Sequence, residues 1–274
     1  MKKRLKAFTL VELIIVMLIM TILLAGILQL FKPVRSAYQD AAYLENKRTV
    51  CNAISKYITE SLRYAQYVGV YKSSESGIGT GATGAKGAAK ALLDKIYNDR
   101  VTLGLSEDDI DNLAPKIQVI GIDYSEGSDT TFNNDTHSGR LYRYKFDTSG
   151  VYSSSGNSFS TPTNFHMSFG ASYYGANDFG INVIQDANKM LVVSASTQGL
   201  FGGDGAVTAS NSLITSETAV ILRNINDSDA KGKMYYITDT TPANGIPDIL
   251  ETGTLASGGN QYFFAFLPSN DMPT

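Results

Sequence analysis

The stretch KAFTLVELIIVMLIM, residues 6–20, determines which structure is predicted for the N-terminal part of the chain. Glu12 places a carboxylate four residues inside an apolar run that otherwise has the composition of a membrane span. An ionised side chain in a hydrocarbon core costs roughly 2.5 to 3.5 kcal/mol even on the mildest scale. We therefore interpret Glu12 as a functional residue and look for the group that pairs with it.

The apolar run is long enough to cross a bilayer. Residues 13–31 carry no charge, and at 1.5 Å per residue a helix over them is about 28 Å long, close to the thickness of a bilayer core. A secretory signal peptide has a shorter apolar region and a small-x-small cleavage site, and no such site follows Gly26. Basic residues before the span favour an N-terminus in the cytoplasm, with the chain after the span on the outer side of the membrane. These residues are Lys2, Lys3, Arg4 and Lys6.

Length and charge narrow the class of protein. A chain of 274 residues can form one large domain or two small ones. Beyond the basic N-terminus, the remaining 19 basic residues face 26 acidic ones, so we expect no nucleic-acid partner. Cys51 is the single cysteine, which excludes an internal disulfide and predicts a small buried residue on a helix face.

The order of features in KAFTLVELIIVMLIM resembles the N-terminus of the type IV prepilins and pseudopilins. These begin with a short basic leader and a small residue, followed by Phe-Thr-Leu-x-Glu at the start of a long apolar helix. The resemblance implies that a prepilin peptidase cuts between Ala7 and Phe8 and methylates the new amino group of Phe8. Ala7 stands where the family most often has Gly. Glu12 falls at the acidic position of the family.

This cut would supply a partner for Glu12. It creates an ammonium group at Phe8, and an acid one helical turn along the chain lies close to the bilayer edge where an amine can meet it. In the family the amine belongs to a neighbouring subunit, so that pairing neutralises two otherwise costly buried charges. The alternative is that Glu12 extends to the lipid headgroups without a partner.

Residues 33–71 continue the helical pattern with an amphipathic face. Together with the span at 8–32, they predict one helix from about Thr9 to Val70, roughly 90 Å long and interrupted or bent near Pro33. The segments GILQLFKPVRSAY and RTVCNAISKYITESLRYAQYVGVY are similar to the W/J-type minor pilins and minor pseudopilins. This narrower resemblance covers about residues 8–71.

The next segment, residues 72–90, is rich in Gly and Ser and predicts an exposed loop. It contains GTGATG, a formal match to the dinucleotide fingerprint. The fingerprint needs a preceding strand within a βαβ unit, and Lys86 is one place too late for a P-loop lysine. Helical spacing returns in residues 88–100, and Ser106 is placed to cap a second short helix. We therefore expect no nucleotide site.

From residue 117 the pattern changes to strands. Short runs of β-branched and aromatic residues are separated by Gly, Asn, Asp and Ser. The predicted fold class is α+β, a type IV pilin-like fold. Its long N-terminal helix, a transmembrane half followed by an amphipathic half, packs on a mostly antiparallel sheet in a globular extracytoplasmic β-rich domain over residues 91–274, after a leader at 1–7. The predicted strands lie within 117–124, 140–147, 164–170, 181–185, 189–196, 218–224, 233–238 and 261–267.

Candidate catalytic and metal-binding residues are few. His137 and His166 have neither a nearby Cys nor a second His at helical spacing, which disfavours a zinc site and a Ser-His-Asp triad. The acids at 107–111 are more typical of a solvated helix start than of a metal cage. We expect no enzymatic activity and no catalytic residue.

Two loops offer oxygen ligands at spacings seen in calcium sites. In residues 226–232, Asp227 and Asp229 are suitably spaced, but Lys231 replaces a ligand. Residues 239–251 lack acids at the early positions of such a loop. Turn chemistry alone explains both loops. The expectation is no cofactor and no metal, with calcium at either loop as the open alternative.

The sequence as a whole predicts a structural subunit, a minor pilin or pseudopilin of a type IV pilus or type II secretion-like filament. A membrane-bound precursor with its N-terminus inside would be processed and then built into an extracellular or periplasmic filament by helix packing. The implied partners are other pilin subunits, the prepilin peptidase and an inner-membrane assembly platform with a separate ATPase. The competing hypothesis is an adhesin-like, ligand-binding subunit at the filament tip.

Overall fold

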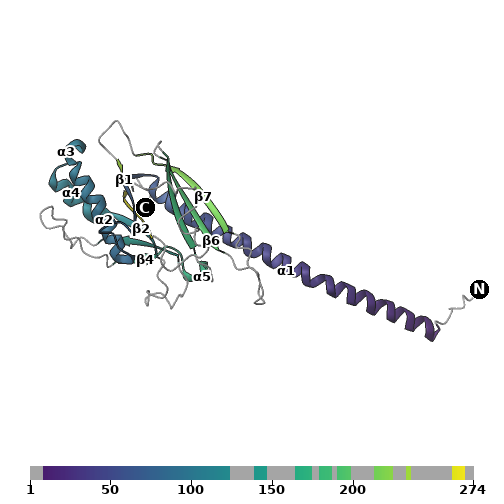
Figure 1. The fold of residues 1–274 in the computed structure, drawn as a ribbon. Helices are drawn as coiled ribbons and strands as arrows, with labels where there is room; N and C mark the ends of the chain where they lie inside the picture. Colours follow the sequence, from purple (N-terminus) through teal and green to yellow (C-terminus); the bar gives the residue numbers. More distant parts are fainter. Residues whose placement is uncertain are drawn as a thin grey trace, which may run out of the picture.

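The fold was analysed in a computed structural model of the chain. The structure describes residues 9–123, 139–146, 164–174, 179–186, 190–198, 213–224, 233–235 and 261–268. A single long helix projects from a body that contains the sheets and the shorter helices (Figure 1). The start of this helix lies at the end of the projection that is farther from the body.

Helix α1 (Leu10–Leu62) has 53 residues and is therefore about 80 Å long. Its first buried residue is Lys47, so the helix up to that point is a stalk outside the body and the rest of α1 is packed into it. Pro33 lies inside the continuous helix. The interruption predicted as one alternative near Pro33 is therefore wrong, because the helix continues although proline cannot donate its backbone hydrogen bond. The other alternative, a bend near Pro33, stays a prediction.

The helix ends earlier than predicted. Residues Ala65–Lys72 form strand β1, which corrects the expectation that the helix continues to Val70. Val68 and Val70 pack in the core that contains α1, whereas Tyr67 and Tyr71 pack in a second core on the other face of the sheet. Both faces of β1 are buried, so its apolar residues do not alternate with polar ones as in a half-exposed strand. These residues also fit the spacing of a helical face, so the sequence pattern did not distinguish a strand from a helix.

Within the described residues, the strands form two sheets. The larger sheet has the order β4-β3-β2-β9-β1-β8 and the smaller has β5-β6-β7. Every pairing is antiparallel except that of β1 with β8, which confirms the predicted antiparallel α+β architecture of a pilin-like fold. The remaining strands are β2 (Gln118–Asp123), β3 (Arg140–Lys145), β4 (Asn164–Met167), β5 (Phe179–Asp186), β6 (Met190–Gln198), β7 (Leu213–Ile221), β8 (Lys233–Tyr235) and β9 (Tyr262–Pro268).

The buried part of α1 lies between the two sheets. Its residues from Val50 to Leu62 share one apolar core with the inner face of the larger sheet and with the smaller sheet. Strand β9 is central to the larger sheet, and Phe264 and Phe266 point from it into this core with no exposed surface. The stalk therefore continues directly into a helical segment that forms part of the core of the body.

Helix α2 (Gly81–Asn98) covers the outer face of the larger sheet. The predicted loop at 72–90 is thus wrong from Gly81 onward. The small residues permit close packing: a Cβ atom at Gly84 would lie 2.3 Å from the ring of Phe263, and Ala85 and Ala88 are fully buried. The many glycine and alanine residues, which we interpreted as typical of an exposed loop, instead allow a helix to approach the sheet closely.

Three short helical segments follow α2. These are α3 (Arg100–Leu103), α4 (Glu107–Leu113) and the 3-10 helix η1 (Ala114–Lys116), and a further short helix, α5 (Ala171–Tyr174), follows β4. Ser106 caps α4 as predicted: its hydroxyl accepts from the Asp109 N–H, and the Asp109 carboxylate accepts from the Ser106 N–H. One of the acids at 107–111, Asp109, therefore takes part in capping the start of α4.

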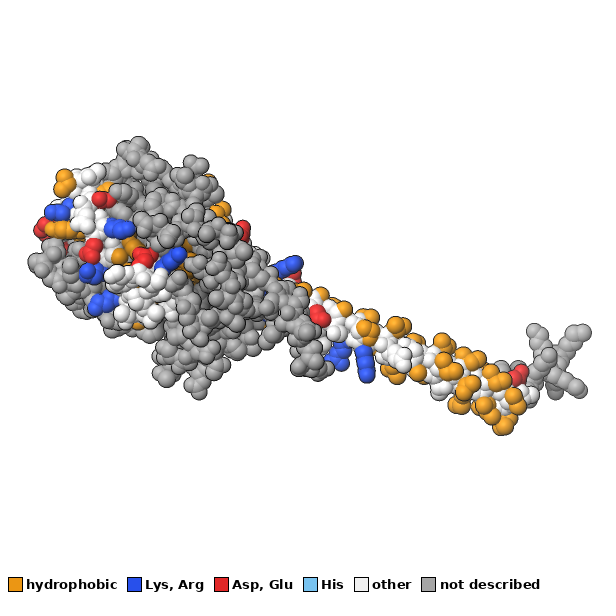
Figure 2. All heavy atoms as spheres, in the orientation of Figure 1, with side chains coloured by type: hydrophobic (Ala, Val, Ile, Leu, Met, Phe, Trp, Pro, Cys, Tyr) orange, Lys and Arg blue, Asp and Glu red, His pale blue; other side chains and the backbone are white. Residues whose placement is uncertain are grey.

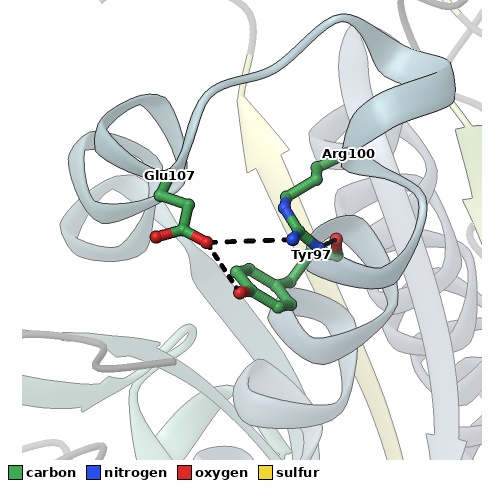
Figure 3. A network of polar contacts seen from close by, with 3 residues as sticks. All are labelled: Tyr97, Arg100 and Glu107. Carbon is green, nitrogen blue, oxygen red and sulfur yellow. Dashed lines mark hydrogen bonds and ion pairs between the residues drawn. The ribbon is translucent and has the colours of Figure 1, made fainter. Parts of the chain in front are cut away.

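A polar network joins α2, α3 and α4 (Figure 3). The Tyr97 hydroxyl donates a hydrogen bond of 2.9 Å to Glu107 Oε1, and Arg100 Nη2 lies 3.8 Å from the same oxygen. Arg100 Nη1 also donates to the Tyr97 carbonyl at 3.0 Å. Because Glu107 is exposed, the ion pair contributes little to stability. The network links these helices at the end of the body opposite the stalk.

Candidate functional site

The functional site predicted from the sequence lies at the start of α1. Thr9 is the N-cap residue and has an extended backbone. Its N–H and its hydroxyl each donate a hydrogen bond of 3.0 Å to Glu12 Oε2, and the Glu12 N–H donates to Thr9 Oγ1 at 3.4 Å. These reciprocal bonds form a capping box, which satisfies N–H groups that the first helical turn leaves unpaired.

The capping box gives Glu12 a partner that the sequence analysis missed. The signal was present, because Thr-Leu-Val-Glu at residues 9–12 has the Ser/Thr-x-x-Glu spacing of a capping box. The carboxylate is turned toward the N-terminal side of the helix, where it meets the peptide N–H of Thr9. Ala7 and Phe8 lie outside the described residues, so the cut between them and the methylation of Phe8 stay predictions.

The capping box leads to a prediction about Thr9. Thr9→Val removes the hydroxyl that binds Glu12 and keeps the size and β-branching of the side chain. We expect faster amide exchange in the first turn of α1, because the Glu12 N–H loses its acceptor. Hydrogen exchange with mass spectrometry in detergent micelles measures this. Thr21→Val is the matched control, since the Thr21 hydroxyl binds the Leu18 carbonyl inside the helix; equal protection of the first turn in both variants would contradict the cap.

The stalk exposes an apolar surface along its whole first half. The space-filling view shows hydrophobic side chains around this part of α1 (Figure 2). Within the described residues, α1 is the one helix long and apolar enough to cross a membrane. Such a surface requires a cover of lipid or of other helices. Its large apolar residues between 10 and 31 are each about half or more exposed: they are Leu10, Val11, Leu13, Ile14, Ile15, Val16, Met17, Leu18, Ile19, Met20, Ile22, Leu23, Leu24, Ile27, Leu28, Leu30 and Phe31.

Cys51 is buried on the inner face of α1, as predicted. Its Sγ lies 3.9 Å from the Ile214 carbonyl oxygen. Burial raises the pKa of the Cys51 thiol to about 12, with a small opposite effect from Lys47. The thiol therefore stays protonated at neutral pH, and this environment does not provide the thiolate that redox or nucleophilic chemistry requires.

This burial predicts the reactivity of Cys51. At pH 8 the folded protein should react with a thiol-specific disulfide reagent at least a hundredfold more slowly than the protein unfolded in urea, because the thiol is both inaccessible and protonated. The absorbance of the released thiolate measures the two rates. A folded protein that reacts as fast as the unfolded protein would show that the inner face of α1 is open to solvent.

The other candidate residues occupy ordinary positions or lie outside the described part. His166 is exposed on β4, and partial burial, followed by the charges of Lys145 and Arg143, lowers its pKa. His137 and the two candidate calcium loops, 226–232 and 239–251, are not among the described residues. Among the residues that are described, no three His, Cys, Asp or Glu side chains are grouped so that they could hold a metal ion.

Comparison with known proteins agrees with the motif at the start of the chain. Residues 2–28 match the family model described as the prokaryotic N-terminal methylation motif. Searches of curated proteins and of solved structures give no match. The matched segment contains Glu12, Thr9 and most of the apolar run. Together with the apolar stalk, it supports a membrane-anchored, type IV pilin-like precursor that is processed by a prepilin peptidase.

Proposed function

We propose that this protein is a minor pilin or minor pseudopilin of the W/J type, which is cut between Ala7 and Phe8 and built into a thin filament. The observation that supports this proposal best is the stalk. An apolar helix projects from a folded body and has a carboxylate, Glu12, in its first turn. A stalk of this kind can serve first as a membrane anchor and then as the core of a filament.

Assembly would move the stalk from lipid to a bundle of similar helices. Both surroundings are apolar, so the hydrophobic effect changes little in this step, and packing and polar contacts decide the outcome. Glu12 would then pair with the Phe8 amine of a neighbouring subunit, which removes two unpaired charges from the filament core. The energy for assembly would come from the separate ATPase of the assembly platform in the inner membrane.

The Thr9 contacts suggest how Glu12 is held before assembly. The Thr9 N–H and hydroxyl both bind Oε2, which leaves the second carboxylate oxygen, Oε1, available to an incoming amine. An intact capping box could therefore orient the carboxylate without competing for all of its acceptor sites.

Mass spectrometry of the N-terminus tests the processing step. We expect protein isolated from sheared filaments to begin at a methylated Phe8. Ala7→Gly, which restores the residue that the family most often has, should be processed at least as well, and Ala7→Leu should accumulate as the precursor. Filament-borne protein that retains Met1 would contradict the proposal.

A tip-located adhesin or ligand-binding subunit is the second candidate function. The observation that favours it is a group of exposed cationic and aromatic side chains on the body, around Arg143 and Tyr173. This role is compatible with the same N-terminal processing. In this role the body, and not the stalk, would determine which ligand is bound.

A further inference from the structure

Strand β3 places two cationic side chains on the α1 side of the larger sheet, and β4 places a histidine beside them. The register places Arg143 opposite His166 and Lys145 opposite Asn164. Alternation along β3 puts Arg143 and Lys145 on the same face, and that face is the one toward α1 because Arg143 Nη1 reaches the Tyr57 hydroxyl. We call the following group the cationic-aromatic patch: Arg143, Lys145, His166, Tyr57, Phe169 and Tyr173.

The Arg143 guanidinium is held in place by neutral partners. Its Nε donates to Gln118 Oε1 at 2.8 Å, Nη2 donates to the same oxygen, and Nη1 donates to the Tyr57 hydroxyl at 3.3 Å. A guanidinium has five N–H groups, so two remain for another acceptor. The side chain is half-buried. A fixed, partly desolvated guanidinium with spare donors is suited to bind an anionic oxygen group.

No described carboxylate neutralises this group of cations. Ion pairs in the described ranges, such as Glu60–Arg63, Lys90–Asp94 and Arg100–Glu107, involve other residues. Arg143 and Lys145 are two residues apart on one face of β3, so their positive charges repel each other. Burial, followed by the charges of Lys145 and Arg143, lowers the pKa of His166, so its imidazole adds no third charge at neutral pH. A bound anion would remove this repulsion.

An aromatic surface adjoins the cations. The rings of Tyr57 and Phe169 meet edge to face with centroids 5.5 Å apart, and Phe169 stacks on Tyr173 at 5.0 Å. Tyr173 is 38% exposed, so it can present ring surface to a ligand. Because Tyr57 contacts both Arg143 and Phe169, the cationic and aromatic parts are continuous.

We propose that the cationic-aromatic patch binds an acidic polysaccharide. Arg143 and Lys145 would pair with its carboxylate or sulfate groups, and a sugar ring would lie against Tyr173. Nucleic acid fits less well, because its affinity depends on contacts with many phosphates, whereas the patch offers two cations, Arg143 and Lys145, in a chain with more acidic than basic residues. This assignment goes beyond the filament role and does not depend on the stalk.

Binding to the full-length protein in detergent micelles tests the assignment. Calorimetric titration would use four probes: oligogalacturonate with carboxylates, chondroitin sulfate oligosaccharide with added sulfates, a neutral cello-oligosaccharide, and single-stranded DNA. We expect one or both acidic oligosaccharides to bind, with affinity that falls as salt rises, and the stronger of the two identifies the preferred anionic group. The neutral sugar and the DNA should bind at least tenfold more weakly.

Variants at exposed positions locate the site. Lys145→Gln and Tyr173→Ser should each weaken binding of the acidic sugar by roughly tenfold, while Lys116→Gln and Tyr38→Ser, at exposed positions on η1 and on the stalk, should leave it unchanged. Circular dichroism confirms that each variant is folded. Absence of binding to both acidic sugars, equal or tighter binding of the neutral sugar or DNA, or equal effects of the patch and control variants would each overturn the assignment.

Discussion

Glu12→Ala should reduce incorporation into filaments by about a hundredfold or more while the precursor stays folded and membrane-bound. The stalk keeps its apolar surface, so insertion into the membrane is unaffected. A filament that contains the variant, however, leaves the Phe8 amine of a neighbour unpaired in an apolar core, and an unpaired buried charge is strongly destabilising. Immunoblots that compare sheared filaments with the membrane fraction measure the effect.

Two variants separate the charge of Glu12 from its role in the helix cap. Glu12→Gln retains an oxygen that can accept from the Thr9 N–H but carries no charge, and we expect it to fail as Glu12→Ala does. Glu45→Ala removes an exposed acid of α1 beyond the apolar run and should assemble normally. If Glu12→Gln assembled as well as the unmodified protein, the cap and not the ion pair would explain the requirement for Glu12.

Gly139→Ala should destabilise the body by about 2 to 5 kcal/mol. Gly139 has φ of +82° and immediately precedes β3, where a Cβ atom would lie 1.8 Å from the carbonyl oxygen of Phe179. The left-handed conformation costs a residue with a Cβ about 1 to 2 kcal/mol, and overpacking adds about 1 to 3 kcal/mol. Because the clash is with backbone, it cannot be relieved by rotation of a side chain, and β3 and β5 must move apart.

Gly77→Ala is the matched control for this prediction. Gly77 has a similar φ of +86°, but a Cβ atom there would meet nothing within 4 Å. Gly77→Ala should lower the free energy of unfolding only by the cost of the left-handed conformation, about 1 to 2 kcal/mol. Urea unfolding in micelles, followed by the near-ultraviolet circular dichroism of the 16 tyrosines, compares the two variants. Equal losses at both positions would show that the space beside Phe179 does not limit Gly139.

The sequence predicted those features that depend on local pattern. The apolar run and Glu12 were evident, because an uncharged stretch long enough to cross a bilayer and a carboxylate at its start can both be recognised from the sequence alone. The strand segments were found because β-branched and aromatic residues alternate between turn residues, and the helix start at Ser106 has a recognisable cap. The order of the strands was not predictable, since pairing β9 between β1 and β2 depends on contacts distant in the sequence.

Two of the errors in the fold, at β1 and at α2, have a common physical cause. β1 is buried on both faces, so its residues lack the alternation of a half-exposed strand. Around Gly84, α2 uses glycine and alanine for contact with the sheet, which gives it the composition of a loop. In both cases tertiary packing determines the structure and the local propensity does not. The patch around Arg143 was also missed, because its members come from α1, β3, β4, α5 and the segment between β4 and α5, which only the fold brings together.

The packing of α1 against β7 determines how the body would respond to a pulling force. Contacts recur in step along the two elements: Cys51 with Ile214, Asn52 with Ser216, and Ser55 with Thr218. Tension along the stalk would therefore act on these contacts in shear, all at once, and would not peel them apart one by one. A filament pulled from its far end would pass that force into the apolar core that α1 shares with both sheets.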